Sequence, residues 1–184
     1  MKNNGFLHLV FLAIAMFLVL PAMAQSESVV TLSGNAYITS GHTAFIDEDH
    51  CTIRNWNDKE TVISFYFRTE KSGDMNIALQ AKGNSKIEVS LLGKKKKITL
   101  ESDELSRIEL GTYKVENPGY VKMDIRGLKI NQGADFGSIA SVTVGGDVCP
   151  VVCVSPVFSS HFGRRGPSVH LNYSLPDENI EWFY

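Results

Sequence analysis

The amino-acid sequence predicts an all-β fold, specifically an antiparallel β-sandwich of jelly-roll type. Apolar and polar residues alternate with a period of two along five short segments: 61–67, 75–81, 87–91, 121–125 and 138–144. This alternation is typical of strands that have one face in a core and the other in water. No apolar stripe of helical length follows residue 24. Many short strands at near-regular spacing favour two sheets stacked face to face.

The segments between these strands contain turn-forming residues. Glycine, asparagine and proline mark turns at 71–74, 82–85, 92–94 and 117–119. A run of four lysines follows the third of these turns, from Lys94 to Lys97. A short charge run between strands indicates a solvated turn, so we expect these lysines to lie in a connection.

The amino terminus predicts export from the cell. An apolar run from Phe6 to Leu20 follows Lys2, and Ala22-Met-Ala24 forms a small-residue cleavage site. The run is short for a spanning helix, which needs about 20 apolar residues. We therefore expect a signal peptide at 1–24, a secreted or periplasmic location and no membrane span after cleavage.

Composition shifts suggest how the remaining chain is organised. We expect the sandwich at 25–146, since Gly145 and Gly146 end the last convincing strand. Residues 147–162 contain Pro150 and Pro156 and are typical of a linker. A new apolar pattern starts at Gly163 and is unfinished at Tyr184, so 163–184 is expected to be the truncated start of a second module. A nucleic-acid partner requires a strongly basic surface, and the net charge of -2 does not indicate one.

The three cysteines permit a disulfide in an exported chain. Cys149 and Cys153 could pair locally, or Cys51 could pair with either of them. The odd count leaves at least one thiol unpaired within a monomer. The cysteine spacing falls short of a zinc signature, and the sequence contains no catalytic motif. We expect no cofactor.

Two loops contain candidate site residues. Asp47, Glu48 and Asp49 could hold a structural Ca²⁺, although a solvated acidic loop is the simpler interpretation. The stretch Asn55-Trp-Asn-Asp58 places an aromatic ring beside amides and a carboxylate, which is the combination that binds sugars. The alternative is that Trp56 packs over the end of the core. Tyr37 could lie at the same end.

The chain resembles the secreted bacterial family described as domain of unknown function 5077, over about residues 29–146. The resemblance lies in Leu32-Ser-Gly-Asn-Ala-Tyr37, Asn55-Trp56, Asn76-Ile-Ala-Leu79, Ile108-Glu-Leu-Gly-Thr-Tyr113, Pro118-Gly-Tyr-Val121 and Phe136-Gly137 through Val144-Gly-Gly146. The segment beginning Gly163-Arg-Arg-Gly is similar to the start of the module described as domain of unknown function 3472. The first module is also similar in layout to carbohydrate-binding jelly rolls, and the resemblance assigns no site residues.

These observations leave three classes of function open. A secreted, non-catalytic module that binds polysaccharide fits Trp56, its polar neighbours and the lack of a catalytic motif. The chain could instead be an accessory domain that packs on a downstream module and has no ligand of its own. It could also be part of a glycoside-processing enzyme whose catalytic part lies in the missing module. We do not expect this chain by itself to be an enzyme.

Overall fold

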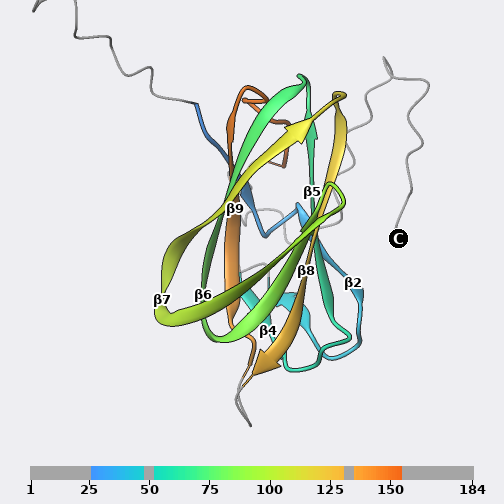
Figure 1. Ribbon diagram of the computed structural model, residues 1–184. Helices are drawn as coiled ribbons and strands as arrows, with labels where there is room; N and C mark the ends of the chain where they lie inside the picture. Colours follow the sequence, from blue (N-terminus) through green and yellow to red (C-terminus); the bar gives the residue numbers. More distant parts are fainter. Residues whose placement is uncertain (1–25, 48–51, 131–134, 155–184) are drawn as a thin grey trace, which may run out of the picture.

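The computed structural model describes residues 26–47, 52–130 and 135–154, and the regular elements within these ranges are strands (Figure 1). Their bounds are β1 Ser28–Thr31, β2 Ala36–Ser40, β3 Phe45–Asp47, β4 Thr52–Arg54, β5 Val62–Thr69, β6 Gly73–Leu91, β7 Lys94–Val115, β8 Gly119–Ile130 and β9 Ser138–Gly146. Each pair of neighbouring strands is antiparallel. The predicted all-β antiparallel fold is therefore confirmed.

The long hairpin of β6 and β7 joins two layers of strands. The first part of β6 pairs with β9 as far as Lys82, and the second part pairs with β8 from Ser85 onward. β7 follows β6 through both parts. One layer, the β9 layer, therefore contains β1 and β9, and the other, the β8 layer, contains β2, β5 and β8. Figure 1 shows the hairpin crossing the front of the molecule and bending at the lower left.

The turn predicted at residues 82–85 is wrong, because this segment forms a bend within β6. Instead of two strands joined by a turn, the chain forms one strand of 19 residues that changes layers. Gly83 makes the bend possible because it has a φ of 148° and because a Cβ there would lie 2.8 Å from the Cα of Gly137. The two backbones cross at a distance that only glycines permit, and a turn-like composition can equally mark such a crossing.

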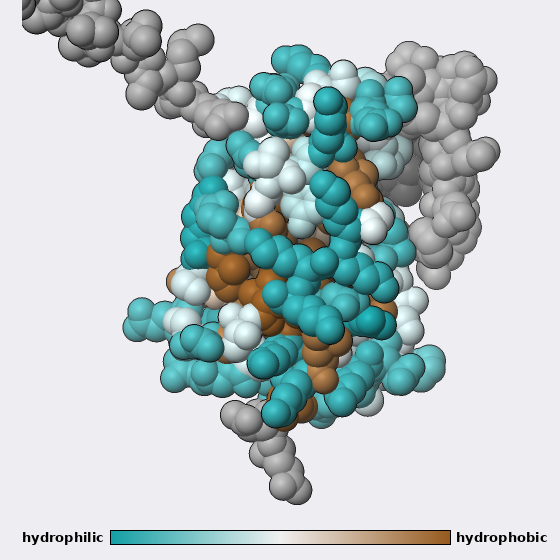
Figure 2. Space-filling model, viewed as in Figure 1, coloured by the Kyte–Doolittle hydropathy of each residue, from teal (hydrophilic) through white to brown (hydrophobic). Residues whose placement is uncertain are grey.

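The lysine run from Lys94 to Lys97 is also placed differently from the prediction. It forms the start of β7, and the turn lies at Leu92 and Gly93. Lys96 lies opposite the buried Val89, so its position belongs to the inward-facing set of the strand. It lies at the open side of the sandwich, where a long side chain can reach water. Figure 2 shows hydrophobic side chains near the middle of this face, bordered by hydrophilic ones.

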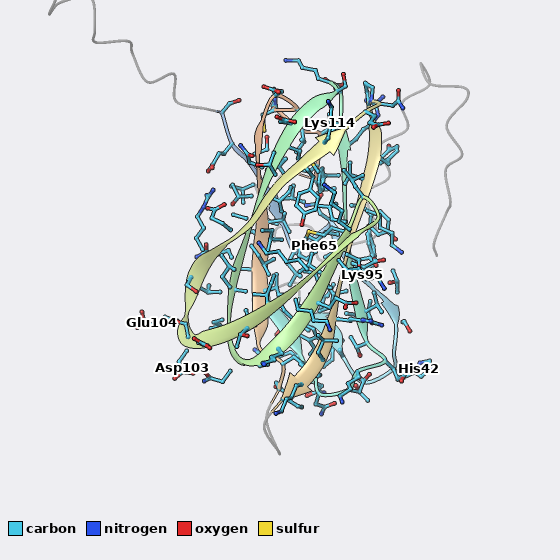
Figure 3. The ribbon with its side chains drawn as sticks, viewed as in Figure 1. His42, Phe65, Lys95, Asp103, Glu104 and Lys114 are labelled. Atoms are coloured by element: carbon cyan, nitrogen blue, oxygen red, sulfur yellow. The ribbon has the colours of Figure 1, made fainter. Side chains whose placement is uncertain are left out.

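The core lies between the two layers and is built from the alternating apolar residues that the sequence predicted. Ile63, Phe65 and Phe67 on β5 are at most 2% exposed, and Figure 3 shows Phe65 at the centre of the molecule. Met123 on β8 and Val142 on β9 are fully buried and come from opposite layers. Burial of these side chains supplies the main driving force for folding.

Residues 147–154, which lie in the range 147–162 expected to be a linker, pack against the other side of the sandwich. Val152 exchanges main-chain hydrogen bonds of 2.8 and 2.9 Å with Arg68 on β5. The main chain of Val154 exchanges bonds of 2.7 and 3.0 Å with the buried Asn35 side chain. Gly34 lies against Val154 so closely that a Cβ there would contact its side chain at 2.8 Å. These contacts explain why the segment Ser33-Gly-Asn35 has a glycine and an asparagine at its second and third positions.

Several predictions concern residues outside the described ranges. The signal peptide at 1–24, the rest of the linker and the module start at 163–184 all lie there. Within the described ranges, no helix is long and apolar enough to span a membrane.

Candidate functional site

Trp56 lies in the core and not on the surface. Its side chain is 0% exposed, and its ring packs against Phe136 with 5.3 Å between the ring centroids. The carbonyl of Trp56 also accepts a hydrogen bond of 2.8 Å from the main-chain N–H of Phe136. A sugar ring needs an accessible aromatic face, so Trp56 cannot serve as the predicted stacking platform in this structure. The structure instead agrees with the alternative interpretation, in which Trp56 packs over the core.

The polar neighbours of Trp56 mainly shape the loop. Asp58 accepts hydrogen bonds from the main-chain N–H and the hydroxyl of Thr61, both at 2.7 Å, and from the hydroxyl of Thr43. These bonds, led by the one from Thr43, hold the pKa of Asp58 below its ordinary value. Asn55 adopts a left-handed φ of 57°, which asparagine tolerates well. Asn55 and Asn57 are exposed.

Tyr37 is placed by β2 on the outer surface of the β8 layer, away from the core that holds Trp56. It is 38% exposed, and its ring meets Tyr66 edge to face at 6.0 Å. Tyr37 is therefore a candidate for binding through a different surface from the one expected.

The candidate calcium loop is described only in part. Asp47 pairs with Arg54 at 3.3 Å, and Glu48 and Asp49 lie outside the described residues. Among the residues that the structure describes, no group of three or more His, Cys, Asp or Glu side chains could hold a metal ion.

The predicted disulfide between Cys149 and Cys153 is not formed, and both cysteines are free thiols. The buried Cys149 thiol faces the carbonyl of Val144 at 3.0 Å, whereas Cys153 faces the carbonyl of Val29 at 3.8 Å. The two thiols contact different strands because residues 149–153 run along the edge of the sandwich. Burial raises the pKa of Cys153, which makes it a weak nucleophile at neutral pH. Cys51 lies outside the described residues.

A hollow of about 530 Å³ lies between the β6–β7 turn and the β7–β8 turn, and we call it the tyrosine hollow. Its lining consists of Leu92, Lys94, Tyr113, Lys114, Val115, Glu116, Asn117, Tyr120 and Val121. Tyr120 is 54% exposed, and Leu92 is 43% exposed. Figure 3 labels Lys114, near the end of β7 at the top of the molecule. The hollow therefore opens at one end of the sandwich.

The tyrosine hollow combines aromatic rings with groups that form hydrogen bonds. The ammonium group of Lys94 lies 5.8 Å from the centroid of the Tyr113 ring, which favours a cation–π contact. Burial raises the pKa of Tyr113, so its hydroxyl stays protonated at neutral pH. Asn117 and Glu116 add an amide and a carboxylate at the rim. Tyr113 is only 5% exposed, so Tyr120 is the ring of this lining that can stack on the apolar face of a sugar, while the polar groups can bond to the sugar hydroxyls.

The sequence contained a signal for this hollow that the prediction did not use. Tyr113 and Tyr120 flank the turn at Asn117-Pro-Gly119, and two tyrosines on either side of a short connection stay at the same end of the sandwich, even though β7 and β8 do not pair with each other. The contribution of Leu92 and Lys94 could not be predicted in this way, because it depends on how the distant β6–β7 turn folds back.

The fold and the hollow define an antiparallel jelly-roll sandwich with an aromatic recess at one end. The chain belongs to the family named Domain of unknown function (DUF5077), whose profile matches residues 30–149. Comparison with curated proteins found no match.

Several solved structures are similar to this chain. A GH26-CBM35 β-(1,4)-mannanase from Podospora anserina aligns with a TM-score of 0.50 and 11% identity, over 66% of this chain and 28% of the mannanase chain. A CBM36-1 domain of a multidomain xylanase from the hindgut metagenome of Trinervitermes trinervoides aligns with a TM-score of 0.48, 13% identity and coverages of 66% and 98%.

A family 35 carbohydrate binding module from Clostridium thermocellum gives a TM-score of 0.46, 8% identity and coverages of 65% and 98%. At these identities, the likeness to the mannanase shows a shared fold, and this chain spans only 28% of the mannanase's length.

Proposed function

We propose that this chain is a secreted, non-catalytic module that binds polysaccharide in the tyrosine hollow. The observation that carries this proposal is the exposure of Tyr120 beside Tyr113 and Lys94 in an open recess. Exposed aromatic side chains at the rim of a recess are the usual means by which a protein holds a sugar ring. Secretion rests on the sequence of residues 1–24.

The shared fold supports the same class of function. The mannanase with the similar fold is described as carrying a CBM35, a carbohydrate-binding module, beside its GH26 part. Fold alone does not fix function, so this support is secondary to the chemistry of the hollow.

The composition of the hollow favours binding over hydrolysis. Glycoside hydrolysis ordinarily uses two carboxyl groups that flank the scissile bond. Among the described residues that line the hollow, Glu116 contributes a carboxyl group beside two lysines and two tyrosines. This set suits a binding site in which sugars stack and form hydrogen bonds.

A glycan array tests the proposal. The purified chain should bind at least one polysaccharide, and Tyr120→Ala should weaken that binding at least tenfold because it removes the exposed ring. Phe45→Ala is the matched control, since Phe45 is 51% exposed on β3 and does not line the hollow. Failure of the folded protein to bind any glycan would contradict the proposal and favour the accessory-domain alternative, in which the domain has no ligand of its own.

A further inference from the structure

The outer face of the β8 layer carries a diagonal row of tyrosines that starts at the hollow. Tyr120 on β8 lies opposite Arg68, Tyr66 on β5 lies opposite Lys122, and Tyr37 on β2 lies opposite Ser64. Successive tyrosines of the row therefore lie on adjacent strands and are offset by two residues along the strand direction. Each of the three tyrosines has a buried residue next to it in its strand, so the rings point outward.

The row is longer than one sugar unit. Diagonal neighbours on adjacent strands have Cα atoms about 7–8 Å apart, so the row extends over roughly 15 Å between Tyr120 and Tyr37. The rings of Tyr37 and Tyr66 are already in contact, at 6.0 Å and an interplanar angle of 64°. This contact limits the motion of both rings before a ligand arrives, which reduces the entropy lost on binding.

The same face carries an excess of positive charge, although the whole chain has a net charge of -2. The outward positions of the β8 layer include the basic residues Arg68, Lys95, Lys97, Lys122 and Arg126 and the acidic residues Glu88 and Asp124.

The acidic side chains Glu88 and Asp124 of this face are already engaged by cations of the same face. Glu88 is bonded by Arg126 at 2.7 Å, and Asp124 accepts the Ser64 hydroxyl at 2.6 Å and lies 3.3 Å from Lys122. The hollow adds Lys94 and Lys114 against Glu116. Arg68 also lies 3.4 Å from Glu70, and Lys95 lies 3.9 Å from Glu88. The positive charge of Lys97, Lys94 and Lys114 is therefore the part that is available to an anionic ligand.

We propose that the ligand is an acidic polysaccharide, bearing carboxylate or sulfate groups, that runs from the tyrosine hollow along Tyr120, Tyr66 and Tyr37. This inference rests on the proposed function and adds the charge and the path of the ligand. Sugar rings stack on the tyrosines, and Lys94 and Lys114 attract the anionic groups. The cations sit beside the rings, so a neutral chain of the same length makes only part of these contacts.

Matched polymers test the charge of the ligand. The full chain is titrated with polygalacturonate and alginate, with their carboxyl-reduced forms, and with chondroitin sulfate and its desulfated form. We expect at least one acidic polymer to bind at least tenfold more tightly than its neutral counterpart, with an affinity that falls as salt rises. The preferred polymer separates a carboxylate ligand from a sulfate ligand. Equal binding of acidic and neutral polymers would overturn the inference while the proposed function stands, and binding of no glycan at all would overturn both.

Substitutions in the row test its path. Tyr37→Ala and Tyr66→Ala should each weaken binding of the long polymer about three- to tenfold, the expected loss for one aromatic contact. They should leave the affinity for a disaccharide unchanged, because a disaccharide fills only the hollow. Thermal unfolding of each variant checks the fold, and Phe45→Ala serves as the surface control. Wild-type affinity for the long polymer in both variants would overturn the proposed path.

Discussion

Lys96 joins the two halves of β7 across the open side of the sandwich. Its ammonium group donates hydrogen bonds to the carbonyl oxygens of Leu110 at 2.8 Å and of Glu109 at 3.2 Å. A register shift between Ile77 and Ala78 leaves Leu110 without a direct partner on β6, as an extra residue in a β-bulge. The lysine thus bonds to main-chain groups at an irregular point of an edge strand.

Loss of this bridge should destabilise the fold. Lys96→Met keeps the length of the side chain and removes the donor, so we expect the free energy of unfolding to fall by about 1 kcal/mol. Lys97→Met is the control, because Lys97 lies on the outer face of the same strand. Urea denaturation of both variants measures the difference, and equal stabilities would show that the bridge contributes nothing.

The crossing of β6 and β9 should tolerate no side chain at Gly137. A Cβ there would overlap the carbonyl oxygen of Lys82, and neither backbone can move without breaking the sheet. We expect Gly137→Ala to cost at least 3 kcal/mol or to prevent folding. Gly111→Ala is a close control, since Gly111 has a φ of 104°, similar to the 118° of Gly137, and has no atom within 4 Å of its Cβ position. A smaller loss in the Gly137 variant than in this control would contradict the crossing.

Trp56 should affect stability more than any other residue of its loop. Trp56→Ala removes a fully buried ring in contact with Phe136, so we expect a loss of about 3–5 kcal/mol. The exposed Asn57 provides the comparison, and Asn57→Ala should change stability by less than about 0.5 kcal/mol. Thermal unfolding followed by circular dichroism checks both values. A stable Trp56→Ala protein would contradict the buried placement.

Asp58 should make the stability of the fold dependent on pH in the acid range. Its hydrogen bonds from Thr43 and Thr61 lower its pKa in the folded protein, so its ionised form stabilises the fold above the unfolded value of about 4. This contribution is lost as the pH falls from about 4 through the lowered pKa. Urea denaturation from pH 7 to pH 2.5 should therefore show that wild type and Asp58→Asn converge in stability at low pH.

The exposed Glu104 at the bend of β7 provides the control for this titration (Figure 3). Glu104→Gln should parallel wild type throughout the range. A constant difference between wild type and Asp58→Asn at all pH values would contradict the assigned role.

Strand alternation allowed the sandwich to be predicted because it is a local property of the sequence. Ile63, Phe65 and Phe67 carry that pattern plainly, and they lie in the core as expected. The alternation does not predict that one strand can pair in both layers. The bend at Gly83 reads locally as a turn, and it is distinguished only by its contact with Gly137, more than fifty residues away.

The candidate site was harder to predict than the fold. The sequence suggested tryptophan and tyrosine as candidate sugar-binding residues, but it could not tell a surface ring from a core ring. Trp56 is buried because Phe136 reaches it from a distant part of the chain, whereas Tyr120 is exposed because its position on β8 points away from the core. The start of β7 was also mispredicted, because it consists of lysines. Lys96 occupies an inward-facing position, where strand alternation alone predicts an apolar residue.

The central claim is that polysaccharide binds at the tyrosine hollow and not at the loop of Trp56. The most direct test is a calorimetric titration of Tyr120→Ala and Asn57→Ala, side by side, with the polysaccharide that the wild-type chain binds best. Both side chains are exposed, so neither substitution should disturb the core. The account predicts at least a tenfold loss of affinity in Tyr120→Ala and wild-type affinity in Asn57→Ala. The opposite result, with binding kept in Tyr120→Ala and lost in Asn57→Ala, would contradict it.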